Sequence, residues 1–430
     1  MKKCLIIGAS GYTGAQLTQL ILQHPNLSIA ALVVSNHSSL RHQSFASVYP
    51  QYAYAFPQNN LIFQSLEDTG LTQTSINPNQ SSCHWSDIDV VFLATPHQVS
   101  ASLAEQFLSH NIQVIDLSGA FRLTQAHQFA DYYGFEHPAS ALLSQAVYGL
   151  PEINRHLFAG AKLIAVAGCY PTAAILSLMP LLDPANGWVE QLTGLPVINA
   201  ISGVSGAGRK ASLPSSFCEV SLQAYGVDGH RHTPEIEQAL SHDVIFTPHL
   251  GAFKRGIYST VTVPIKSVPI KPKSVKAIAA NKTPDKTEFT QATLKKLYQR
   301  YYADSALVQI SDTVPALSDV EQTPMVKMFV RLNADKGYLQ IYTVIDNLLK
   351  GAAVNAIQCF NLSHDYPETE GLSPINSGYT AVDDSKQFHA EKQDPQQANS
   401  YKSKITNNKS SVSKPSVNKI SVTSNVAGGV

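Results

Sequence analysis

The sequence has no excess of charge of either sign and no long apolar run. Its 430 residues carry 31 basic and 31 acidic side chains, so the formal net charge is zero. A chain without a positive excess has no overall electrostatic attraction for nucleic acid or for an anionic membrane surface. No apolar stretch approaches the roughly 20 residues that a membrane-spanning helix needs. We therefore expect neither a nucleic-acid partner nor a membrane association.

Cysteine is scarce as well. The five cysteines are odd in number and scattered, with no Cys-x-x-Cys pair. This pattern disfavours a disulfide framework and a zinc knuckle, and it suits a reducing compartment. The first residues, "MKKCLIIGAS", have the two lysines of a signal peptide, but the apolar core that follows them is far too short. We therefore expect a cytoplasmic protein.

The chain does contain enough apolar material for two domains, since 44% of its residues are apolar. In the first part, apolar strands alternate with helical stretches, and the expected strands cover residues 3–8, 27–35, 89–96 and 112–119. Such alternation is typical of an α/β fold with a Rossmann-type doubly wound parallel sheet. Between residues 49 and 87 the pattern lapses into polar residues, which predicts a long surface excursion.

The second part has a different pattern, with fewer helices and more hairpins. Strand-like segments separated by turn residues cover residues 196–208, 243–251 and 256–266, and an antiparallel hairpin is expected over 325–346. This pattern predicts a second, α+β domain with a mixed sheet.

These patterns suggest a domain division. We expect a first domain at residues 1–155 that contains the parallel sheet, and residues 347–372 return to helical spacing. Residues 156–346 then form the second domain, with the mixed sheet. Beyond residue 374 periodicity is lost, so residues 374–430 are expected to be a disordered basic tail.

Three glycines stand between the first strand and the first helix. In "IIGASGYTG" they are Gly8, Gly11 and Gly14. Glycine there lets backbone N–H groups approach a pyrophosphate, and the helix N-terminus adds partial positive charge. Further contacts are expected from Ser10, Tyr12 and Thr13. The spacing differs from the commoner Gly-x-Gly-x-x-Gly fingerprint, so a tight turn without a ligand stays as the alternative.

The end of the second strand favours NADP(H) over NAD. An NAD site usually places Asp or Glu about 20 residues past the glycines. Here that segment reads "VVSNHSSLRH" and contains no acid, but it offers Ser35, Asn36, Ser38 and Arg41. Hydroxyl and amide donors together with a cation suit a 2′-phosphate.

A cysteine occupies the corner between another strand and a helix. In "LIAVAGCYPTAAILSLMPLL" the apolar run ends at Gly168, Cys169 follows, and Pro171 opens the expected helix. A thiol at a helix N-terminus lies in a positive local field, which predicts a lowered pKa and a larger thiolate fraction. The free N–H groups can also hold an oxyanion on an attacked carbonyl carbon. The alternative is a buried, inert cysteine.

The segment "GVDGHRHTPEIEQAL" places two histidines before a helix. We expect Thr233 to cap that helix, so His230 and His232 lie in the loop that leads into it. The adjacent dipole favours a neutral imidazole, which can act as general acid–base toward a thiohemiacetal oxygen. One alternative is a pair of surface histidines. Another is a metal site with His249 or Cys218, but the ligand set is not convincing and we expect no metal.

Two more segments offer polar contacts. The segment "SGVSGAGRK" can wrap a phosphate or the nicotinamide, or can be a flexible turn, and its candidates are Ser205, Gly206, Ala207, Gly208 and Arg209. The segment "DLSGAFRL" ends a strand and presents Ser118 and Arg122. Arginine there can fork onto a substrate carboxylate or phosphate, and the alternative is a structural ion pair.

A series of strings occurs along the chain in this order: "GASGYTG", "LATPHQVS", "DLSGAFRL", "YGLPEINR", "AGCYPTAAIL", "SGVSGAGRK", "GHRHTPEI" and "DNLLKGAA". Together they resemble the N-acetyl-gamma-glutamyl-phosphate reductases, a family within the semialdehyde dehydrogenase superfamily. The resemblance covers roughly residues 3–372. One departure is that Val354 and Asn355 stand where the family usually has Gly and Gln, which alters helix packing more than chemistry.

The resemblance implies that NADPH reduces N-acetyl-L-glutamyl 5-phosphate to N-acetyl-L-glutamate 5-semialdehyde, a step of arginine biosynthesis. Cys169 would carry the acyl group as a thioester. A histidine would manage the proton, with His232 favoured for that role and His230 for substrate contact. The resemblance also implies an NADP-binding Rossmann domain at residues 1–155, completed by the C-terminal helix at 347–372, and an inserted catalytic and dimerisation α+β domain at 156–346. It further implies a homo-oligomer, either a dimer or a tetramer.

The resemblance assigns the other candidates as well. Ser118, Arg122 and Arg209 would bind the carboxylate and the phosphate of the acyl-phosphate substrate. The first glycine turn and residues 205–208 would hold the dinucleotide, and Asn347 would approach the nicotinamide. Two alternatives stay open: an enzyme like aspartate-semialdehyde dehydrogenase, and a non-catalytic NADP-binding redox sensor.

Overall fold

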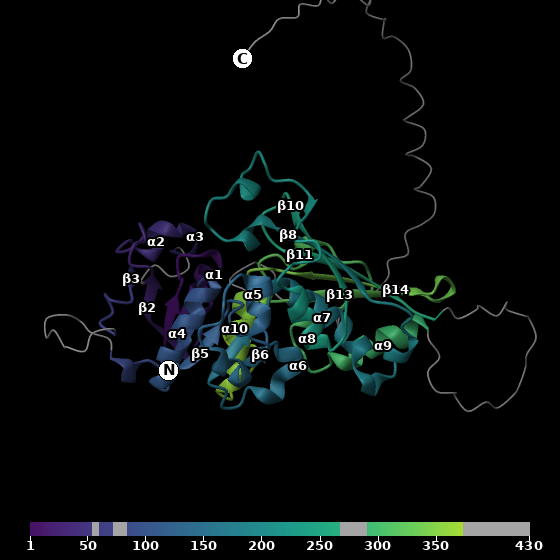
Figure 1. The fold of residues 1–430 in the computed structure, drawn as a ribbon, viewed down its shortest axis with the longest axis horizontal. Coiled ribbons are helices and arrows are strands. Elements are labelled where there is room, and N and C mark those ends of the chain that lie inside the picture. Colours follow the sequence, from purple (N-terminus) through teal and green to yellow (C-terminus); the bar gives the residue numbers. More distant parts are fainter. Residues whose placement is uncertain (54–59, 72–83, 267–289, 373–430) are drawn as a thin grey trace, which may run out of the picture. The chain divides into compact units, whose positions relative to one another are not determined.

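Two sheets form the framework of the computed structural model, which describes residues 1–53, 60–71, 84–266 and 290–372 (Figure 1). The first sheet is parallel throughout and has the strand order β3-β2-β1-β4-β5-β7-β6. Its strands are β1 (Lys2–Ile7), β2 (Leu27–Val34), β3 (Phe63–Ser65), β4 (Val90–Leu93), β5 (Gln113–Asp116), β6 (Val147–Gly149) and β7 (Leu163–Val166). The strand order switches direction between β1 and β4, where sheets of this kind bind dinucleotides.

Helices cover both faces of this sheet, which is why its strands read as continuous apolar runs. The helices are α1 (Tyr12–Leu22), α2 (Phe45–Val48), α3 (Pro50–Ala53), α4 (His97–Ser109), α5 (His127–Tyr133), α6 (Pro151–Asn154) and α10 (Val354–Ser363). In β1, Cys4 and Ile6 share a core with α1 and α10, whereas Leu5 and Ile7 share another with α4. The C-terminal helix α10 therefore returns to the first sheet.

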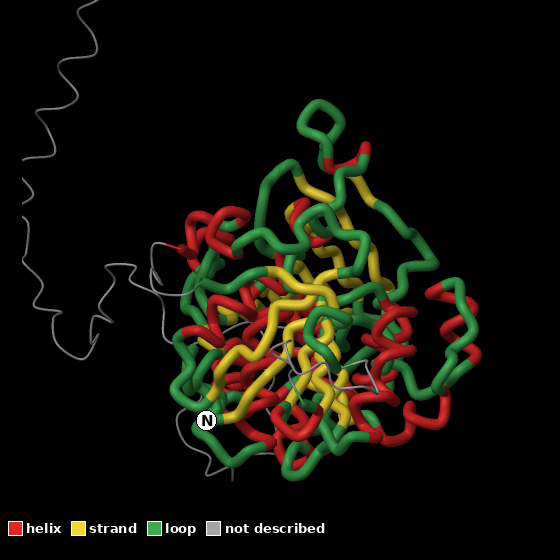
Figure 2. Tube along the Cα trace, turned by 90° about the vertical axis from the view of Figure 1, so that its left-hand side faces the viewer, coloured by secondary structure: helices red, strands yellow, loops and turns green. Residues whose placement is uncertain are grey.

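The second sheet is mixed, with the order β12-β13-β14-β11-β8-β10-β9. Its strands are β8 (Val197–Gly203), β9 (Gln223–Ala224), β10 (Ile245–Gly251), β11 (Ile257–Pro264), β12 (Val308–Ile310), β13 (Val326–Asn333) and β14 (Tyr338–Ile345). The helices here are α7 (Cys169–Leu182), α8 (Thr233–Leu240) and α9 (Gln291–Tyr301). Their apolar side chains share one core with apolar residues at alternate positions of β11 and β13. Figure 2 shows the strands of both sheets in yellow near the middle of the molecule.

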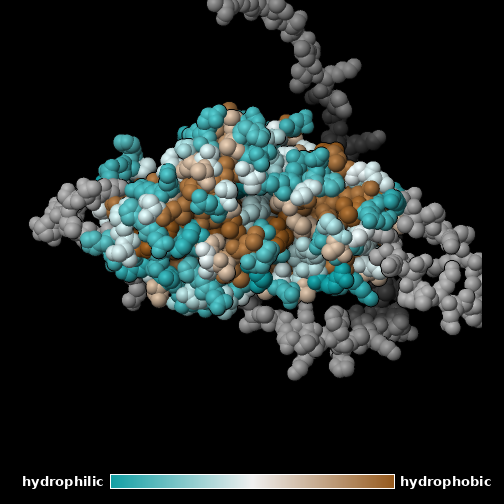
Figure 3. Space-filling model, turned by 60° about the horizontal axis from the view of Figure 1, so that its bottom comes forward, coloured by the Kyte–Doolittle hydropathy of each residue, from teal (hydrophilic) through white to brown (hydrophobic). Residues whose placement is uncertain are grey.

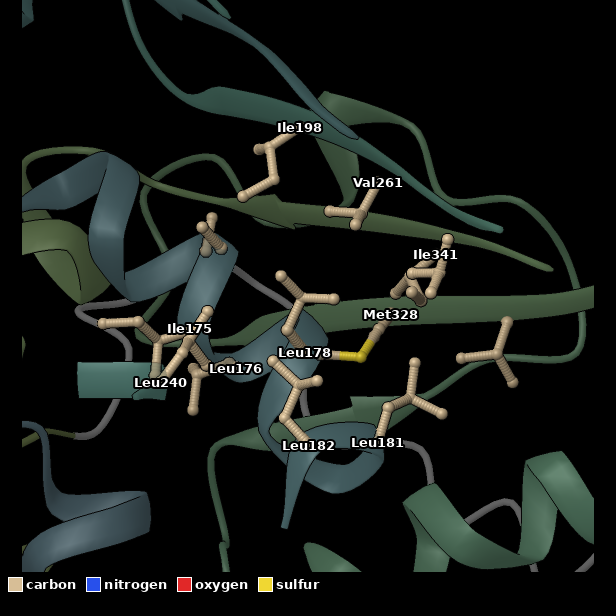
Figure 4. Packing of buried hydrophobic residues seen from close by; sticks show 14 of the residues in the cluster. Ile175, Leu176, Leu178, Leu181, Leu182, Ile198, Leu240, Val261, Met328 and Ile341 are labelled. Carbon is tan, nitrogen blue, oxygen red and sulfur yellow. The ribbon is translucent and has the colours of Figure 1, made fainter. Parts of the chain in front are cut away.

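Helix α7 is buried against the second sheet because almost its whole surface is apolar. Its side chains Leu178 and Leu181 pack with Ile198, Val261 and Met328 of the sheet (Figure 4). The same helix carries Cys169 at its first position, so the packing of the second sheet fixes where the thiol stands.

The expected fold class is confirmed, and so is the hairpin, in which β13 pairs antiparallel with β14. The expected surface excursion at 49–87 is wrong in part, because β3 lies inside it and extends the first sheet, with Phe63 fully buried. The first sheet also continues past residue 155, since β7 pairs with β5 and β6. The predicted tail at 374–430 lies outside the described residues.

Apolar residues also reach the surface. Figure 3 shows hydrophobic residues gathered in a band across one face of the molecule. The segment that connects β8 to β9 of the second sheet exposes Leu213, Leu222 and Phe217, the last with 94% of its surface accessible. Among the described helices, none is both long and apolar enough to cross a membrane.

Candidate active site

The corner between β7 and α7 brings the side chains of Arg122, His232 and Glu235 together at Gly168, directly before Cys169. Gly168 caps α7 with an extended backbone and has no side chain to satisfy the first N–H groups. A Cβ atom at Gly168 would lie 2.8 Å from Nη1 of Arg122 and from Nε2 of His232, and 3.1 Å from Oε2 of Glu235. Any side chain at this position would have to displace these groups. On another side, a Cβ at Gly351 would lie 2.8 Å from Cβ of Cys169, so the "DNLLKGAA" glycine also lies against the cysteine.

The thiol pKa differs from the sequence-based expectation. Burial raises the pKa of Cys169, while Arg122, the Tyr170 N–H and Arg231 lower it by less. The prediction of a lowered pKa is therefore wrong for this structure. Burial thus outweighs the partial positive charge at the start of α7.

The two histidines meet at this corner from the loop before α8. His232, not Thr233, occupies the capping position of α8, and it is only 6% exposed. Burial lowers its pKa well below the ordinary value, helped by His230 and Arg122, so the imidazole is neutral. Its Nδ1 is buried without a hydrogen-bond partner among the described residues.

His230 stands behind His232 and supports it. Its Nδ1 accepts the backbone N–H of His232 at 3.1 Å. Its ring packs edge-on against Tyr170 and Tyr225. Burial lowers the pKa of His230 to about 4. Both imidazoles are therefore neutral at physiological pH.

Glu235 is a functional residue that the sequence reasoning did not single out. Its carboxylate is fully buried in the first turn of α8 and accepts the N–H of Gly168 at 2.8 Å. The same Oε1 accepts the hydroxyl of Tyr148 at 2.8 Å, and Oε2 faces Arg122 at 3.4 Å. The sequence signal that could have identified Glu235 is its position in the first turn of the expected helix, three residues after His232. Glu235 thus ties α8 to the peptide directly before Cys169.

Arg122 and Ser118 both lie near this corner with their polar atoms engaged by the protein. Arg122 donates from Nε to the Val166 carbonyl at 2.7 Å and from Nη2 to the Leu117 carbonyl at 2.9 Å. Ser118 donates to the buried carboxylate of Asp116 at 2.9 Å. These contacts hold the ends of β5 and β7, and they leave little of either side chain free for a substrate.

A different cation is exposed here. Arg231 stands between the two anchored histidines, and its charge lowers the pKa of Cys169, His230 and His232. It also acts on His97, whose pKa burial lowers to about 3. The Nδ1 of His97 accepts the Gly119 N–H at 2.7 Å. The sequence reasoning missed Arg231 because it lies within a string that drew attention for its histidines.

The first glycine turn has a tight side and an open side. A Cβ at Gly8 would lie 2.2 Å from the Ala94 carbonyl oxygen, and one at Gly14 would lie 2.4 Å from the Gly8 carbonyl oxygen, so both glycines allow close packing. Gly11 caps α1 without a side-chain hydrogen bond. This helix start includes the predicted residues Ser10, directly before Gly11, and Tyr12 and Thr13, directly after it. The turn therefore presents backbone N–H groups to a ligand.

A cavity of about 280 Å³ opens beside this turn. It is lined by Tyr12, Tyr49, Gln51, Tyr52, Val204, Ser205, Gly208, Arg209, Lys210, Ala211, Ser215, Lys254, Arg255 and Leu348. The tyrosines come from the first sheet's side, and the cations come from the loops of the second sheet. Four cations with aromatic rings suit a phosphate-bearing, ring-containing ligand.

The predicted residues Ser205, Gly208 and Arg209 line this cavity, and others lie next to them. Arg209 donates to the Ser10 carbonyl at 3.2 Å and lies over the Tyr49 ring at 5.2 Å, so the structure places it with the dinucleotide turn rather than with Cys169. Asn347 accepts the Gly256 N–H at 2.7 Å and donates to Ser205 at 3.0 Å. The turn through Gly206, Ala207 and Gly208 follows directly.

At the end of β2, Ser35 is exposed and Arg41 is paired. The guanidinium of Arg41 binds the carboxylate of Asp68. This acid comes from the segment that the sequence reasoning treated as an excursion. The backbone N–H groups at α1, the cations of the cavity and the donors at the end of β2 together fit NADP(H).

Asn355, which stands where the family usually has Gln, lies in a buried polar cluster. Lys350 is fully buried and donates to Glu152 at 2.6 Å, to Asn355 at 2.7 Å and to Gln358 at 2.6 Å. Asn355 in turn donates to Thr172, in the first turn of α7, at 3.2 Å. These motif residues stabilise the fold beneath the cysteine and do not reach the cavity.

The fold and the site define an NAD(P)-dependent oxidoreductase of the semialdehyde dehydrogenase class. The family model "Semialdehyde dehydrogenase, NAD binding domain" matches residues 3–161, and "Semialdehyde dehydrogenase, dimerisation domain" matches residues 169–347. Aspartate semialdehyde dehydrogenase II of Vibrio cholerae has the same fold, with a TM-score of 0.57 and 15% identity over 85% of this chain and 98% of that one.

Sequence comparison narrows the class to one family. The N-acetyl-gamma-glutamyl-phosphate reductase of Alteromonas mediterranea is 45% identical over 85% of this chain and 98% of its own length. That of Pasteurella multocida is 46% identical over 86% of this chain and its full length. The chain belongs to the N-acetyl-gamma-glutamyl-phosphate reductases, and its cofactor is NADP(H).

Proposed function

We propose that this chain catalyses the NADPH-dependent reduction of N-acetyl-L-glutamyl 5-phosphate to N-acetyl-L-glutamate 5-semialdehyde and phosphate, a step of arginine biosynthesis. The observation that carries the proposal is the convergence of Arg122, His232 and Glu235 on Gly168, directly before Cys169. The names of the related reductases support the substrate. The aspartate semialdehyde dehydrogenases resemble the chain in fold alone, so they do not favour a second substrate.

Cys169 is the proposed nucleophile, and it needs a base. Because burial raises its pKa, the thiol is protonated at neutral pH. His232 is the proposed base, since its imidazole is neutral and its Nε2 lies beside Gly168. His232 takes the thiol proton as Sγ bonds to the acyl carbon. The bond from that carbon to the phosphate oxygen breaks, and the departing phosphate takes the proton.

Bound NADPH supplies the hydride that reduces the acyl carbon of the thioester. The chain's own groups stabilise the oxygen that becomes negative. The uncapped first turn of α7 presents its N–H groups there, and His232 can hold a proton at the same oxygen. The carbon–sulfur bond then breaks to release the aldehyde, and the sulfur of Cys169 takes up a proton from solvent.

Glu235 is a proposed positioning residue for this chemistry. It holds the Gly168 N–H and faces Arg122, so it fixes the strand end that leads to the nucleophile. Arg231 is a proposed substrate contact for the carboxylate or phosphate, since Arg122 and Ser118 are engaged by the protein. The first glycine turn, Ser205 and Asn347 are proposed to hold the cofactor.

The test is the phosphate-dependent reverse reaction. Full-length protein is supplied with N-acetylglutamate 5-semialdehyde, NADP and phosphate, and NADPH absorbance is followed. Intact-protein mass spectrometry without phosphate should then find the N-acetylglutamyl group on Cys169. Activity with aspartate semialdehyde in place of the N-acetylated aldehyde would overturn the proposed substrate, and an unmodified Cys169 during turnover would overturn the thioester.

We further propose that the protein works in the cytoplasm as a homo-oligomer. Its described cysteines are free, which suits a reducing compartment. A family model named for dimerisation matches residues 169–347, and this region exposes Phe217 and Leu213. Light scattering of the purified chain tests the oligomer. A monomer at all concentrations would contradict it.

A further inference from the structure

The loops that follow β2 and β3 are joined by charged side chains. Val34 pairs with Ser65 in the parallel ladder, so the two strands end side by side. Just beyond, Nε of Arg41 donates to Oδ2 of Asp68 at 2.7 Å, and Nη2 donates to Oδ1. The carboxylate thus grips one edge of the guanidinium with two parallel bonds, which is the strongest geometry for this pair.

Asp68 is itself fixed to the end of β3. Its Oδ2 accepts the N–H of Ser65 at 2.7 Å, and its own N–H donates to Oγ of Ser65 at 3.1 Å. Ser65 is fully buried in the sheet. The hydrogen bond from Arg41 lowers the pKa of Asp68 well below its ordinary value, so the carboxylate is ionised at neutral pH. A rigid strand end therefore holds the arginine through a charged clamp.

The clamp leaves the other edge of the guanidinium free. Arginine has five N–H donors, and the pair with Asp68 uses Nε and one hydrogen of Nη2. Within the described part of the chain, no acceptor is bonded to Nη1 of Arg41, and its side chain is 30% exposed. The edge formed by Nη1 and Nη2 can therefore take a second anion in the same forked geometry.

We propose that Asp68 is a positioning residue for cofactor selection, which holds Arg41 so that its free edge binds the 2′-phosphate of NADP(H). The inference rests on the proposed function, because it takes NADPH as the reductant. In a sheet of this order, the adenosine ribose lies beyond the end of the second strand, where Arg41 stands. The carboxylate binds a different edge of the guanidinium from the edge that would face the ligand, so orientation outweighs its screened repulsion of the phosphate.

The test measures binding to the full-length protein without turnover. Adenosine 2′,5′-bisphosphate, which carries the 2′-phosphate, and ADP, which lacks it, are titrated calorimetrically. We expect Asp68→Asn to weaken the 2′,5′-bisphosphate about tenfold and to leave ADP within about twofold. Arg41→Ala should weaken the 2′,5′-bisphosphate at least as much. The double variant should equal Arg41→Ala, because Asp68 acts only through the arginine.

A matched control is Asp319→Asn. Asp319 also forms a surface ion pair, with Lys327 at 2.9 Å, and it lies outside the cofactor region. This variant should leave both titrations unchanged. In steady-state assays, Asp68→Asn should raise the KM for NADPH at unchanged kcat and leave the KM for NADH unchanged.

Three outcomes would overturn the inference: equal or tighter 2′,5′-bisphosphate binding in Asp68→Asn, an equal loss of ADP binding, or a double variant weaker than Arg41→Ala. The first would mean that the carboxylate neutralises the arginine, and the second that it only supports the loop. Neither titration involves Cys169, so a failure of the proposed reaction, seen as no turnover in the unaltered protein, is distinguishable.

Discussion

Two corners of the first sheet have nearly the same backbone and different chemistry. Gly11 caps α1 with φ −76° and ψ 164°, and Gly168 caps α7 with φ −67° and ψ 158°. Both follow a buried parallel strand, and neither cap has a side-chain hydrogen bond. Each therefore presents the same partial positive charge and the same free N–H groups.

The difference lies in what the rest of the chain brings to each corner. A Cβ at Gly11 would meet only the Gly8 carbonyl oxygen, at 3.4 Å. At Gly168 it would meet three ionisable side chains, of Arg122, His232 and Glu235. The corner at Gly11, which we call the open corner, has room for a large anion. The corner at Gly168, which we call the crowded corner, has the side chains that can transfer a proton to or from the Cys169 thiol. A strand-to-helix corner thus supplies an electrostatic site, and distant residues decide whether it binds or reacts.

Replacing the nucleophile at the crowded corner should have the largest effect. We expect Cys169→Ser to lower kcat about 10⁴-fold or more, because a hydroxyl is a far weaker nucleophile beside the same base. NADP-dependent oxidation of the aldehyde in the presence of phosphate measures this. NADPH binding should persist, since the open corner is untouched. Cys218→Ser, at an exposed cysteine, is the control. Full turnover in Cys169→Ser would show that the Cys169 thiol is not the nucleophile, and the two corners would then not differ in reactivity.

The base should come next, with a diagnostic pH dependence. We expect His232→Ala to lower kcat/KM about 10²- to 10³-fold at pH 7. Burial raises the pKa of the Cys169 thiol, so without a base only the rare thiolate reacts. Raising the pH deprotonates the thiol, and the variant's rate should therefore climb about tenfold per pH unit above pH 7. The unaltered enzyme should be flat there, because neutral His232 removes the proton.

His230→Ala serves as the matched variant for this profile. It removes the supporting ring but leaves His232 in place, so its pH profile should stay flat while its rate falls less. If the steep profile appeared in His230→Ala and not in His232→Ala, the two histidines would have exchanged roles.

The two capping glycines allow a direct test of the comparison. Gly168→Ala would push a methyl group into Arg122 and His232, and we expect kcat to fall about 10²-fold through their displacement. Gly11→Ala has room for its methyl group, which would cover N–H groups that face the cofactor, so the KM for NADPH should rise about tenfold at nearly unchanged kcat. A kcat loss in Gly11→Ala as large as in Gly168→Ala would contradict the assignment of cofactor binding to the open corner and of catalysis to the crowded corner.

Much of the open corner could be predicted from the sequence because its determinants are local. The strand, the glycines and the helix lie within residues 2–22, and a continuous apolar run identifies a strand buried on both faces. The crowded corner depends on distance along the chain. Gly168 and Glu235 are 67 residues apart when they hydrogen-bond, and no local pattern records that contact.

The same reasoning explains the wrong expectations. The pKa of Cys169 was predicted from the helix end alone, but burial by other elements outweighs that local field. Strand β3 has only three residues, "FQS", with one polar residue between the buried Phe63 and Ser65, so it is too short for any periodicity to show. Missing β3 also hid Asp68, the acid that pairs with Arg41.

The smallest effect should come from the polar cluster beneath the crowded corner. Asn355→Ala removes one acceptor from the buried Lys350 and one donor from Thr172, at the start of α7. Lys350 keeps Glu152 and Gln358, so we expect a loss of about 1–2 kcal/mol in the free energy of unfolding, measured with urea. The turnover number should be unchanged, because the cluster supports α7 without touching the thiol. If kcat fell in Asn355→Ala as far as in Gly168→Ala, the polar cluster would take part in the function of the crowded corner. The difference between the two corners would then not be confined to the three side chains around Gly168.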